Sequence, residues 1–374
     1  MKKVLLVATV QSHICQFHKP LVRILHDAGY EVHVAARNNL AEKNGLALDF
    51  ADRVFDLPFA RSPLSVSNAV AYRKLKALID AQGYEIVHCN TPVGGVLARL
   101  ACRRARRKGL CVLYTAHGFH FYHGAPIKNW LFYYPIEWVC ARMTDRLLTI
   151  TDEDEALARR SFKTTVCRIH GVGADAARFY PVGMQQKMQL REAYGIPPKA
   201  RLILCVGELL PNKNQKTAIA AMSRVIKDCP DALLCIAGNG PGEQELRVQI
   251  SALGLEAHVR LLGYTTQIED WYRMADALVS CSYREGLPMN VIEAMLCAKP
   301  VVASINRGHR ELVAHKKTGY LVPADNADEY ARVLTRLLTD SVFAQEMGCS
   351  AVQRAQAYTA ERVQAELSCI YRNL

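Results

Sequence analysis

The amino-acid sequence predicts an α/β protein built from two doubly wound, Rossmann-like domains. At 374 residues the chain has the length of two domains of roughly 100 to 200 residues each. Short runs of β-branched and apolar residues alternate with longer amphipathic stretches from one end to the other. Strands and helices that alternate in this way form parallel sheets covered by helices on both faces. The composition, 50% hydrophobic and 22% charged, excludes a disordered or low-complexity chain.

Ten short apolar runs are expected to be the strands of the two sheets. Between them lie helical patterns, such as residues 93–101, where apolar side chains recur at the spacing of one helix face. The predicted strands of the first half cover residues 4–8, 31–35, 86–89, 112–115 and 146–150, and those of the second half cover residues 202–206, 233–237, 259–262, 277–280 and 300–303.

A polar segment rich in Gly and Pro, residues 171–200, interrupts the alternation before a new strand begins at Leu202. We therefore expect an N-terminal domain at residues 1–175 and a C-terminal domain at residues 176–358. A last helix, residues 359–374, could cross back to the N-terminal domain. Two such domains are expected to face a central cleft, with ligands at the carboxyl ends of the strands.

We expect the protein to be cytoplasmic. The apolar run after Met1 resembles a signal peptide, but it is short, and Gln11-Ser12-His13 stands where small residues would mark a cleavage site. No stretch approaches the ~20 apolar residues of a membrane span. The thirteen cysteines are an odd number without a CxxC pair, which fits free thiols in a reducing compartment better than disulfides or a zinc site.

Positive charge is concentrated in the first half of the chain. Residues 1–180 hold 25 Lys and Arg against 15 Asp and Glu, and the formal net charge of the whole chain is +12. This excess favours an anionic partner, which could be nucleic acid, anionic lipid or a phosphorylated substrate. A helical pattern at residues 93–108 carries arginines opposite its apolar face, and an aromatic segment follows at residues 129–134. A solvated surface helix explains these residues, and so does peripheral attachment to the inner face of the plasma membrane. The arginines are Arg99, Arg103, Arg106 and Arg107.

The strongest motif is SYREGLPMNVIEAM at residues 282–295, between a predicted strand and a helix that Pro288 is expected to open. The free backbone N–H groups of a helix N-terminus can bind a phosphate. Glu285 lies in the loop and Glu293 about one turn into the helix, so two carboxylates can accept hydrogen bonds from hydroxyl groups. An ordinary βα turn with a solvated glutamate at each end would show the same residues.

The motif resembles the Glu-x7-Glu signature of retaining, two-domain GT-B glycosyltransferases, in particular family 4. Other features match this family in order. Lys213 stands six residues beyond Gly207, and Gly238 lies in a glycine turn after the next strand. In the first half, His117 follows a strand as the family's histidine does. The resemblance covers essentially the whole chain and is more specific in the second half.

The resemblance implies that the C-terminal domain binds a nucleotide-sugar donor, with UDP as the expected nucleotide, and that the N-terminal domain binds the acceptor. Lys213 would neutralise the donor diphosphate, Glu293 would hold the ribose and Glu285 a sugar hydroxyl. His117 would contact the sugar near the reacting carbon. The N–H groups at the helix start would bind the diphosphate, and the remaining donor residues would be Gly207, Gly238 and Arg284. The residues at that helix start are Gly286, Leu287, Pro288 and Met289. A solvated turn lysine and a core histidine are the alternatives for Lys213 and His117.

The reaction implied is transfer of a hexose or N-acetylhexosamine with retention of configuration. Its acceptor would be a glycan or a polyprenyl-diphosphate-linked glycan of a surface polysaccharide, such as a capsule or exopolysaccharide. The family needs no cofactor and no essential metal. Asp152-Glu153-Asp154 has the DxD spacing of metal-dependent transferases, but these residues open a predicted helix, where acidic side chains favour the N-terminal dipole.

Two positions depart from the family pattern. Glu208 stands where the family usually has an arginine on the diphosphate, so Arg284, Lys216 or Arg310 would have to compensate. The first loop, expected at residues 9–13, lacks the family's Gly-Gly. His13 and His18 lie there and are candidates for the acceptor side.

Other functions remain open on the sequence alone. A UDP-sugar 2-epimerase has the same fold but needs no acceptor, and a non-catalytic partner in a synthase complex would explain Glu208. Nucleic-acid binding rests on charge alone. A nicotinamide oxidoreductase lacks its GxGxxG after the first strand.

Overall fold

The computed structural model describes residues 2–42 and 46–374, which form two compact units. The first unit comprises Met1–Gly173 together with Ala360–Leu374, and the second comprises Ala174–Thr359. The chain therefore leaves the first unit, builds the second from one continuous segment, and returns to the first with its last helix.

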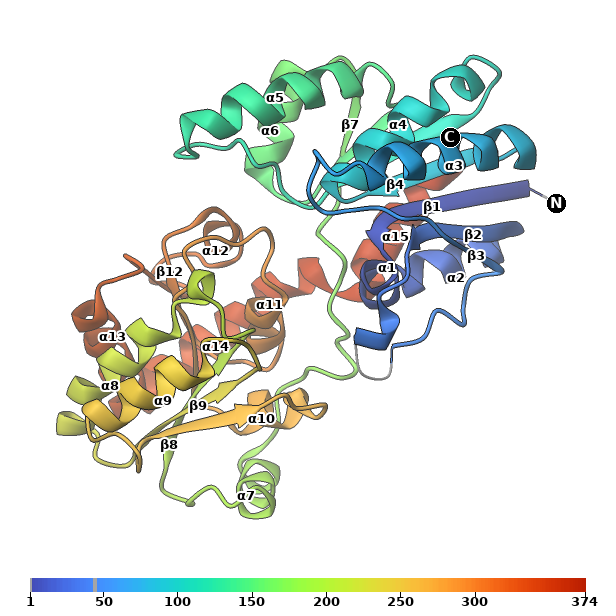
Figure 1. Ribbon diagram of the computed structural model, residues 1–374. Coiled ribbons are helices and arrows are strands. Elements are labelled where there is room, and N and C mark those ends of the chain that lie inside the picture. Colours follow the sequence, from blue (N-terminus) through green and yellow to red (C-terminus); the bar gives the residue numbers. More distant parts are fainter. Residues whose placement is uncertain (1, 43–45) are drawn as a thin grey trace. The chain divides into compact units, whose positions relative to one another are not determined.

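The first unit contains a seven-stranded parallel sheet in the order β3-β2-β1-β4-β5-β6-β7 (Figure 1). Strands β1 and β4 pair in the register Val4 to Ile86, and both are buried along most of their length. The switch from β1–β2 on one side to β1–β4 on the other is the point at which doubly wound sheets bind ligands. The strands are β1 (Lys2–Val10), β2 (Tyr30–Arg37), β3 (Arg53–Asp56), β4 (Ile86–Asn90), β5 (Cys111–Ala116), β6 (Arg146–Thr149) and β7 (Thr165–Arg168).

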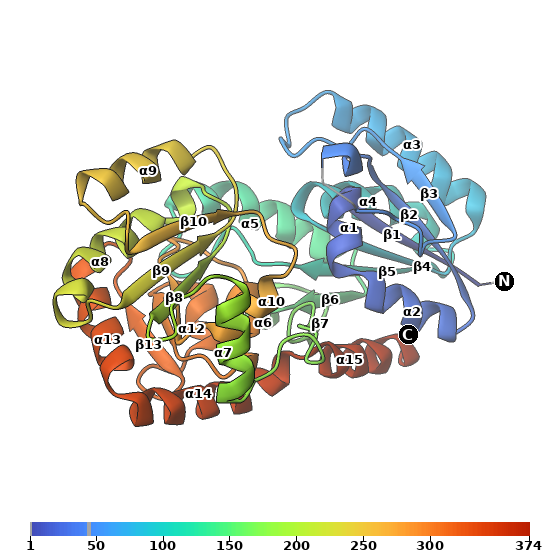
Figure 2. The same ribbon diagram turned by 90° about the horizontal axis from the view of Figure 1, so that it is seen from below.

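Helices cover both faces of this sheet. One face packs against α3, α4, α5 and α6, around a core that includes Leu75, Ala98 and Tyr114. On the other face, α15 lies beside α2 (Figure 2). The helices are α1 (Gln11–Phe17), α2 (Lys19–Asp27), α3 (Ser67–Gln82), α4 (Pro92–Arg106), α5 (Ile127–Ala141), α6 (Asp152–Ser161) and α15 (Ala360–Arg372), and a short 3-10 helix, η1, covers Leu40–Glu42.

The last helix, α15, is an integral part of the first unit. Its Val363 and Leu367 are buried. The Tyr371 hydroxyl lies 2.7 Å from Nδ1 of His88 on β4, and Glu366 accepts a 2.7 Å contact from Nδ1 of His170. Apolar burial and polar contacts together fix this helix to the first sheet.

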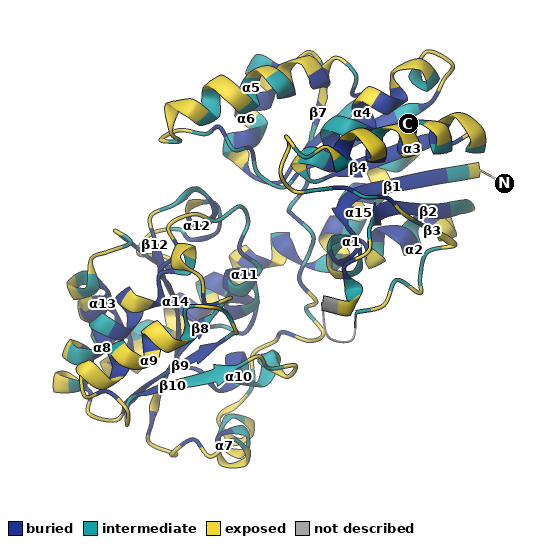
Figure 3. Ribbon diagram, in the orientation of Figure 1, coloured by how far each residue is buried: buried dark blue, intermediate teal, exposed yellow. Residues whose placement is uncertain are grey.

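The second unit contains a six-stranded parallel sheet in the order β10-β9-β8-β11-β12-β13. Strands β8, β9, β11 and β12 are mostly dark blue in Figure 3, because their side chains are buried on both faces, as in parallel sheets generally, whereas the edge strand β10 is largely teal. The strands are β8 (Arg201–Val206), β9 (Ala232–Ala237), β10 (Val259–Gly263), β11 (Ala277–Ser280), β12 (Val301–Ser304) and β13 (Gly319–Val322).

Two hydrophobic clusters sandwich the second sheet. One packs α8, α9 and α13 on a face that includes Ile203 and Val279, and the other packs α7, α10 and α11 around Leu204 and Leu278. Helix α14 contributes Met347 to the first cluster and Ala351 to the second. The helices are α7 (Met184–Ala193), α8 (Gln215–Asp228), α9 (Glu243–Ala252), α10 (Ile268–Met274), α11 (Met289–Leu296), α12 (Arg307–Leu312), α13 (Ala327–Thr339) and α14 (Ser341–Ala355), with 3-10 helices η2 (Pro211–Lys213) and η3 (Gln356–Tyr358).

All ten predicted strands are present, and the structure adds β3, β7 and β13. Each of the three added strands has four residues and lies at a sheet edge. Edge strands are short and often polar, so their sequence pattern is weak. Two local predictions are wrong. Residues 171–200 contain a helix, α7, and residues 11–13 belong to α1 and not to a loop.

The prediction that Arg99 lies on a solvated helix face is also wrong. Arg99 is fully buried, donates to both carboxylate oxygens of Glu137 on α5 at 2.7 and 3.1 Å, and stacks 3.9 Å from the ring centre of Tyr114. A buried ion pair needs such complete pairing to offset the cost of desolvation. Arg106 is likewise engaged, with Asp145 at 2.7 Å.

Candidate active site

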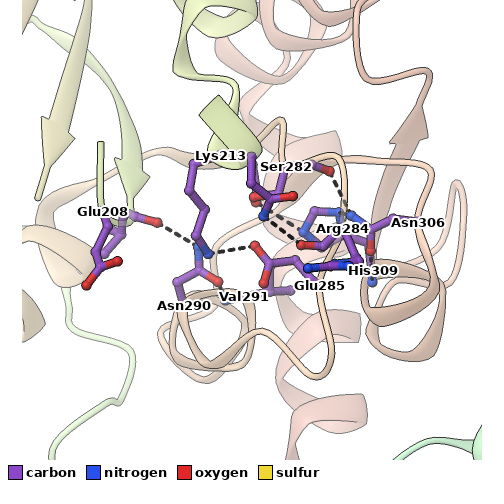
Figure 4. A network of polar contacts seen from close by, with 12 residues as sticks. Glu208, Lys213, Ser282, Arg284, Glu285, Asn290, Val291, Asn306 and His309 are labelled. Atoms are coloured by element: carbon purple, nitrogen blue, oxygen red, sulfur yellow. Dashed lines mark hydrogen bonds and ion pairs between the residues drawn. The ribbon is translucent and has the colours of Figure 1, made fainter. Parts of the chain in front are cut away.

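The centre of the candidate site is an ion pair between two loops of the second unit. Lys213 ends η2, after β8, and Glu285 lies in the loop between β11 and α11. The Lys213 Nζ is 2.7 Å from Oε1 of Glu285 (Figure 4). Both side chains are largely but not fully buried. The sequence predicted both residues as site residues, and the fold brings them into contact across 72 residues of sequence.

Glycines allow the loops around this pair to approach closely. A Cβ at Gly238 would meet the carbonyl oxygen of Gly207 at 2.0 Å, and one at Gly207 would lie 3.4 Å from Cδ of Lys213. A Cβ at Gly240 would meet the carbonyl oxygen of Leu209 at 2.5 Å. The ends of β8 and β9 can therefore come together only without side chains at Gly238 and Gly240.

Helix α11 directs its N-terminus toward the loop that holds Glu285. The helix begins at Met289, one residue later than predicted, and Pro288 is its N-cap. Gly286 and Leu287 complete the connection and are partly buried. The first N–H groups of a helix have no partner within it and carry partial positive charge. Asn290 ties this turn to β8, since its Nδ2 donates to the carbonyl oxygen of Val206 at 2.8 Å.

Glu293 lies one turn into α11 and is partly buried. Burial raises the pKa of its carboxyl group, and the hydroxyl of Tyr272 opposes this shift by donating a hydrogen bond to Oε2 at 2.9 Å. Tyr272 itself is fully buried on α10. One carboxylate oxygen is thus fixed by Tyr272, and the sequence reasoning did not identify that tyrosine.

The acidic departure from the family pattern, Glu208, is exposed, and in Figure 4 its carboxylate points away from Lys213. Its backbone carbonyl accepts a hydrogen bond from Nε2 of Gln215 at 3.0 Å. Among the three cations considered as compensation, Lys216 pairs with Glu245. Arg284 and Arg310 have exposed side chains, and the Arg284 carbonyl accepts from Nδ2 of Asn212.

A buried network around His309 supports the loop that holds Glu285. The sequence analysis did not identify this network. His309 contacts Ser280 and Ser304, and Ser304 donates to the carbonyl oxygen of Ser282 at the start of the loop. Burial lowers the pKa of His309 to about 4, so the ring is neutral near pH 7. A Cβ at Gly308 would meet the Gly286 carbonyl oxygen at 2.4 Å, so α12 also lies directly against this loop.

In the first unit, three predicted residues gather at the carboxyl ends of β1 and β5. His117 follows β5, His13 lies in α1, and His18 lies between α1 and α2. The ring centres of His13 and His117 are 4.8 Å apart, and Nε2 of His117 is 3.2 Å from Oδ1 of Asn90. Burial lowers the pKa of His117 to about 4.

The DxD sequence serves as a helix start. Asp152 and Glu153 lie in the first turn of α6, and the Thr151 hydroxyl accepts from the N–H of Asp154. Acidic residues in a first helical turn stabilise the helix dipole.

The residues of the chain match two sequence families that together span most of it. Residues 186–354 match the glycosyl transferases group 1 family, and residues 3–151 match the glycosyl transferase 4-like family. A Bacillus subtilis protein named "Putative glycosyltransferase EpsD" is 40% identical over 374 residues, covering 99% of this chain and 96% of EpsD. The chain is a member of the glycosyl transferases group 1 family. The membership predicted from the sequence is confirmed, and the protein is a glycosyltransferase.

The transferase is also similar to a further curated relative in sequence and to solved structures in fold. An Escherichia coli UDP-Gal:alpha-D-GlcNAc-diphosphoundecaprenol alpha-1,3-galactosyltransferase is 27% identical over 315 residues, covering 82% of this chain and 80% of that protein. Among solved structures, Anabaena HepE in complex with UDP and glucose aligns with a TM-score of 0.78 at 21% identity, over all of both chains. Sucrose-phosphate synthase from Thermosynechococcus elongatus aligns with a TM-score of 0.77 at 21% identity, over 100% of this chain and 99% of the synthase. The predicted GT-B class with two Rossmann-like domains is confirmed.

Proposed function

We propose that the transferase moves a hexose or N-acetylhexosamine from a UDP-sugar to a glycan or polyprenyl-diphosphate-linked acceptor in surface polysaccharide synthesis, with retention of configuration and without an essential metal. The observation that carries the donor part is the Lys213–Glu285 pair beside the start of α11. It offers a cation, helix N–H groups and two carboxylates, Glu285 and Glu293, within one loop and helix. A diphosphate, a ribose and a sugar hydroxyl are the groups that this set binds.

In this proposal the second unit binds the donor. When a diphosphate arrives, Lys213 exchanges part of its contact with Glu285 for the phosphate oxygens, and Glu285 becomes free to accept from a sugar hydroxyl. The free oxygen of Glu293 accepts from the ribose, while Tyr272 holds the other oxygen. The bond from the sugar carbon to the diphosphate breaks, the acceptor oxygen bonds to that carbon on the same face, and its proton passes to the departing diphosphate. Lys213 and the helix N–H groups stabilise the charge that develops there.

The neutral ring of His117 suits a hydrogen bond to the donor sugar. A charged imidazolium would repel the developing positive charge of the reacting carbon, and burial keeps this ring neutral at pH 7. The relatives support the donor and acceptor classes: one is named for UDP-Gal and a diphosphoundecaprenol-linked acceptor, and another was solved with UDP and glucose.

The test is a donor panel followed by product analysis. We expect UDP, but not GDP or ADP, to raise the melting temperature, and a UDP-sugar with a polyprenyl-diphosphate glycan to yield an α-linked product in excess chelator. Formation of a C2 epimer from UDP-sugar alone would replace the proposal with the epimerase function. Absence of any shift with every nucleotide would favour the non-catalytic partner.

We also propose that the first unit attaches to an anionic membrane surface through α5 and the end of α4. Helix α5 carries a row of exposed apolar side chains. Five arginines line a neighbouring cavity of about 780 Å³, together with Leu100, Val139 and Leu374. Arg142 covers the Trp138 ring at 3.3 Å. Apolar side chains beside clustered arginines are the elements of an interfacial membrane contact. The apolar residues are Ile127, Leu131, Phe132, Trp138 and Val139, and the arginines are Arg103, Arg106, Arg107, Arg142 and Arg146.

Sedimentation with vesicles tests this attachment. We expect the wild type to sediment with vesicles that contain anionic lipid at low salt, and Leu131→Asp to weaken sedimentation about tenfold or more. Val248→Asp, at another well exposed apolar residue, which lies in the second unit, is the matched control and should sediment as the wild type does. Equal sedimentation of Leu131→Asp and Val248→Asp would reject this surface.

Within the described residues, no helix is long and apolar enough to cross a bilayer.

A further inference from the structure

Three histidines of the first unit form a compact cluster. His13, His18 and His117 each present a ring nitrogen, and the three nitrogens lie within 4.8 Å of one another. Their ring centres are separated by 4.8 Å (His13 to His117), 5.2 Å (His13 to His18) and 6.0 Å (His18 to His117). They come from α1, the α1–α2 connection and the end of β5, so the fold, and not one local turn, brings them together.

The cluster has nitrogen atoms that no described group of the protein satisfies. The Nε2 atoms of His13 and His18 are buried and have no hydrogen-bond partner among the described residues. His117 is oriented by Oδ1 of Asn90 at 3.2 Å from its Nε2. Because an amide oxygen only accepts, Nε2 of His117 carries the proton and its lone pair lies on Nδ1. Buried polar atoms without a partner are rare in native proteins and point to a missing ligand.

A fourth histidine, His88, lies nearby but is fully engaged. Its Nδ1 contacts the Tyr371 hydroxyl and its Nε2 contacts the Thr115 hydroxyl, both at 2.7 Å. His88 is therefore a structural histidine, whereas His13 and His18 each have a ring nitrogen available to a ligand.

The electrostatics of the cluster suit a metal cation. Neutral imidazole is the form of histidine that binds metal. The group contains no carboxylate. Three imidazoles without oxygen ligands favour Zn²⁺, Co²⁺ or Ni²⁺ over Mg²⁺ or Ca²⁺.

The cluster borders two cavities. His13 lines a cavity of about 410 Å³. His18 and His117 line a small enclosed cavity of about 20 Å³, which is the space of a single water or ion. Ring nitrogens on a tetrahedral Zn²⁺ lie roughly 3.4 Å apart, since each bond is about 2.0–2.1 Å. The widest separation must therefore shorten by roughly 1–1.5 Å, and the partly exposed His13 is the residue best able to move.

We propose that His13, His18 and His117 bind one divalent transition-metal ion, with Zn²⁺ preferred, and leave a fourth position open to water. Asn90 is the residue that positions His117 for this role, in the manner of groups that orient metal-bound histidines. The ion is not needed for transfer. Because it takes the lone pair of His117, it inhibits transfer reversibly, a consequence that rests on the proposed role of His117 at the donor sugar.

Cobalt is the probe that tests the site directly. The full-length protein without substrates is titrated with Co²⁺, and we expect intense visible absorption from a four- or five-coordinate ion at one equivalent, which Zn²⁺ abolishes. His13→Gln and His18→Gln should each weaken Co²⁺ binding more than about 100-fold, because loss of a ligand costs more than the 10–100-fold of an outer partner. His13→Gln is the safer variant for folding, since His13 is only partly buried.

The matched control is His123→Gln, an exposed histidine of the same unit. It should bind Co²⁺ as the wild type does. The proposal is overturned by an absence of visible bands in the wild type, by unchanged affinity in His13→Gln, or by loss of binding in His123→Gln. Inhibition of transfer by Zn²⁺ is measured separately: metal binding without inhibition would contradict the role of His117 in transfer and leave the metal site standing.

Discussion

The ammonium group of Lys213 lies 2.7 Å from the carboxylate of Glu285, although the two residues belong to different βα loops. Each charge therefore neutralises the other. The contact also holds both side chains in place, which lowers the cost of ordering them when a ligand binds.

Replacement of Lys213 by alanine should produce the largest loss of rate among single changes in the donor loops. Removal of a group that stabilises charge in the transition state typically lowers turnover about 10²–10³-fold. Initial rates at saturating donor measure this loss. Lys227→Ala, an exposed lysine of α8, is the control and should retain the wild-type rate. A loss of less than about threefold in Lys213→Ala would contradict the assigned role.

The change Glu285→Gln should separate binding from turnover. Without the opposing carboxylate, the charge of Lys213 is free for phosphate, so we expect UDP to bind a few-fold more tightly. Turnover should fall about 100-fold, since the amide no longer accepts from the sugar hydroxyl as a carboxylate does. Calorimetry with UDP and initial rates with the UDP-sugar measure the two effects. Weaker UDP binding would show that Glu285 supports the loop and does not restrain Lys213.

The change Tyr272→Phe should weaken donor binding with little effect on turnover. The hydroxyl fixes one oxygen of Glu293 and holds down a carboxyl pKa that burial raises. Its removal raises that pKa further, so the loss in donor affinity should be greatest at low pH, where more Glu293 is protonated. We expect KM for the donor to rise about tenfold at pH 7, because uniform binding is lost. An equal fall in kcat would place Tyr272 in the chemical step.

The buried histidines should make the first unit sensitive to acid. Burial lowers the pKa of His88 to about 3 and that of His117 to about 4, against about 6.5 in an unfolded chain. Unfolding then takes up protons, so the stabilising contribution is complete above about pH 6.5 and is lost as the pH falls toward these folded values. Hydrogen exchange of β4 and β5 in denaturant, from pH 7 to pH 5, measures the slope. His88→Gln should reduce it by up to ~1.4 kcal/mol per pH unit, whereas the exposed control His123→Gln should not.

The change Gly238→Ala should destabilise the second unit by more than about 3 kcal/mol, since its new Cβ would stand 2.0 Å from the Gly207 carbonyl oxygen. Gly183→Ala places a Cβ in open space and should change stability by less than about 0.5 kcal/mol. Melting temperatures with and without UDP compare the two variants. Equal melting temperatures would show that the β8 and β9 loops can separate at little cost.

The sequence predicted that Lys213 and Glu285 belong to one site, and the structure brings them into contact. Glu285 and Glu293 could be predicted from the strand before them, and Lys213 from its match to the family motif. Tyr272 and His309 could not, because each acts through a contact with a distant segment that no local pattern records. Arg99 shows the same limit: the helical period assigns it to a polar face, and only the tertiary position of Glu137 on α5 explains its burial.

The return of the chain to the first unit through α15 has a consequence for the order of folding. During synthesis the earlier domain usually completes its fold first. Here His88 on β4 and His170 after β7 have their partners, Tyr371 and Glu366, on α15, which is synthesised after the second unit. The second unit, continuous from Ala174 to Thr359, has all of its residues earlier. The nascent chain therefore holds a complete second unit while its first unit still lacks α15, and a chain truncated before residue 360 lacks the partners of His88 and His170.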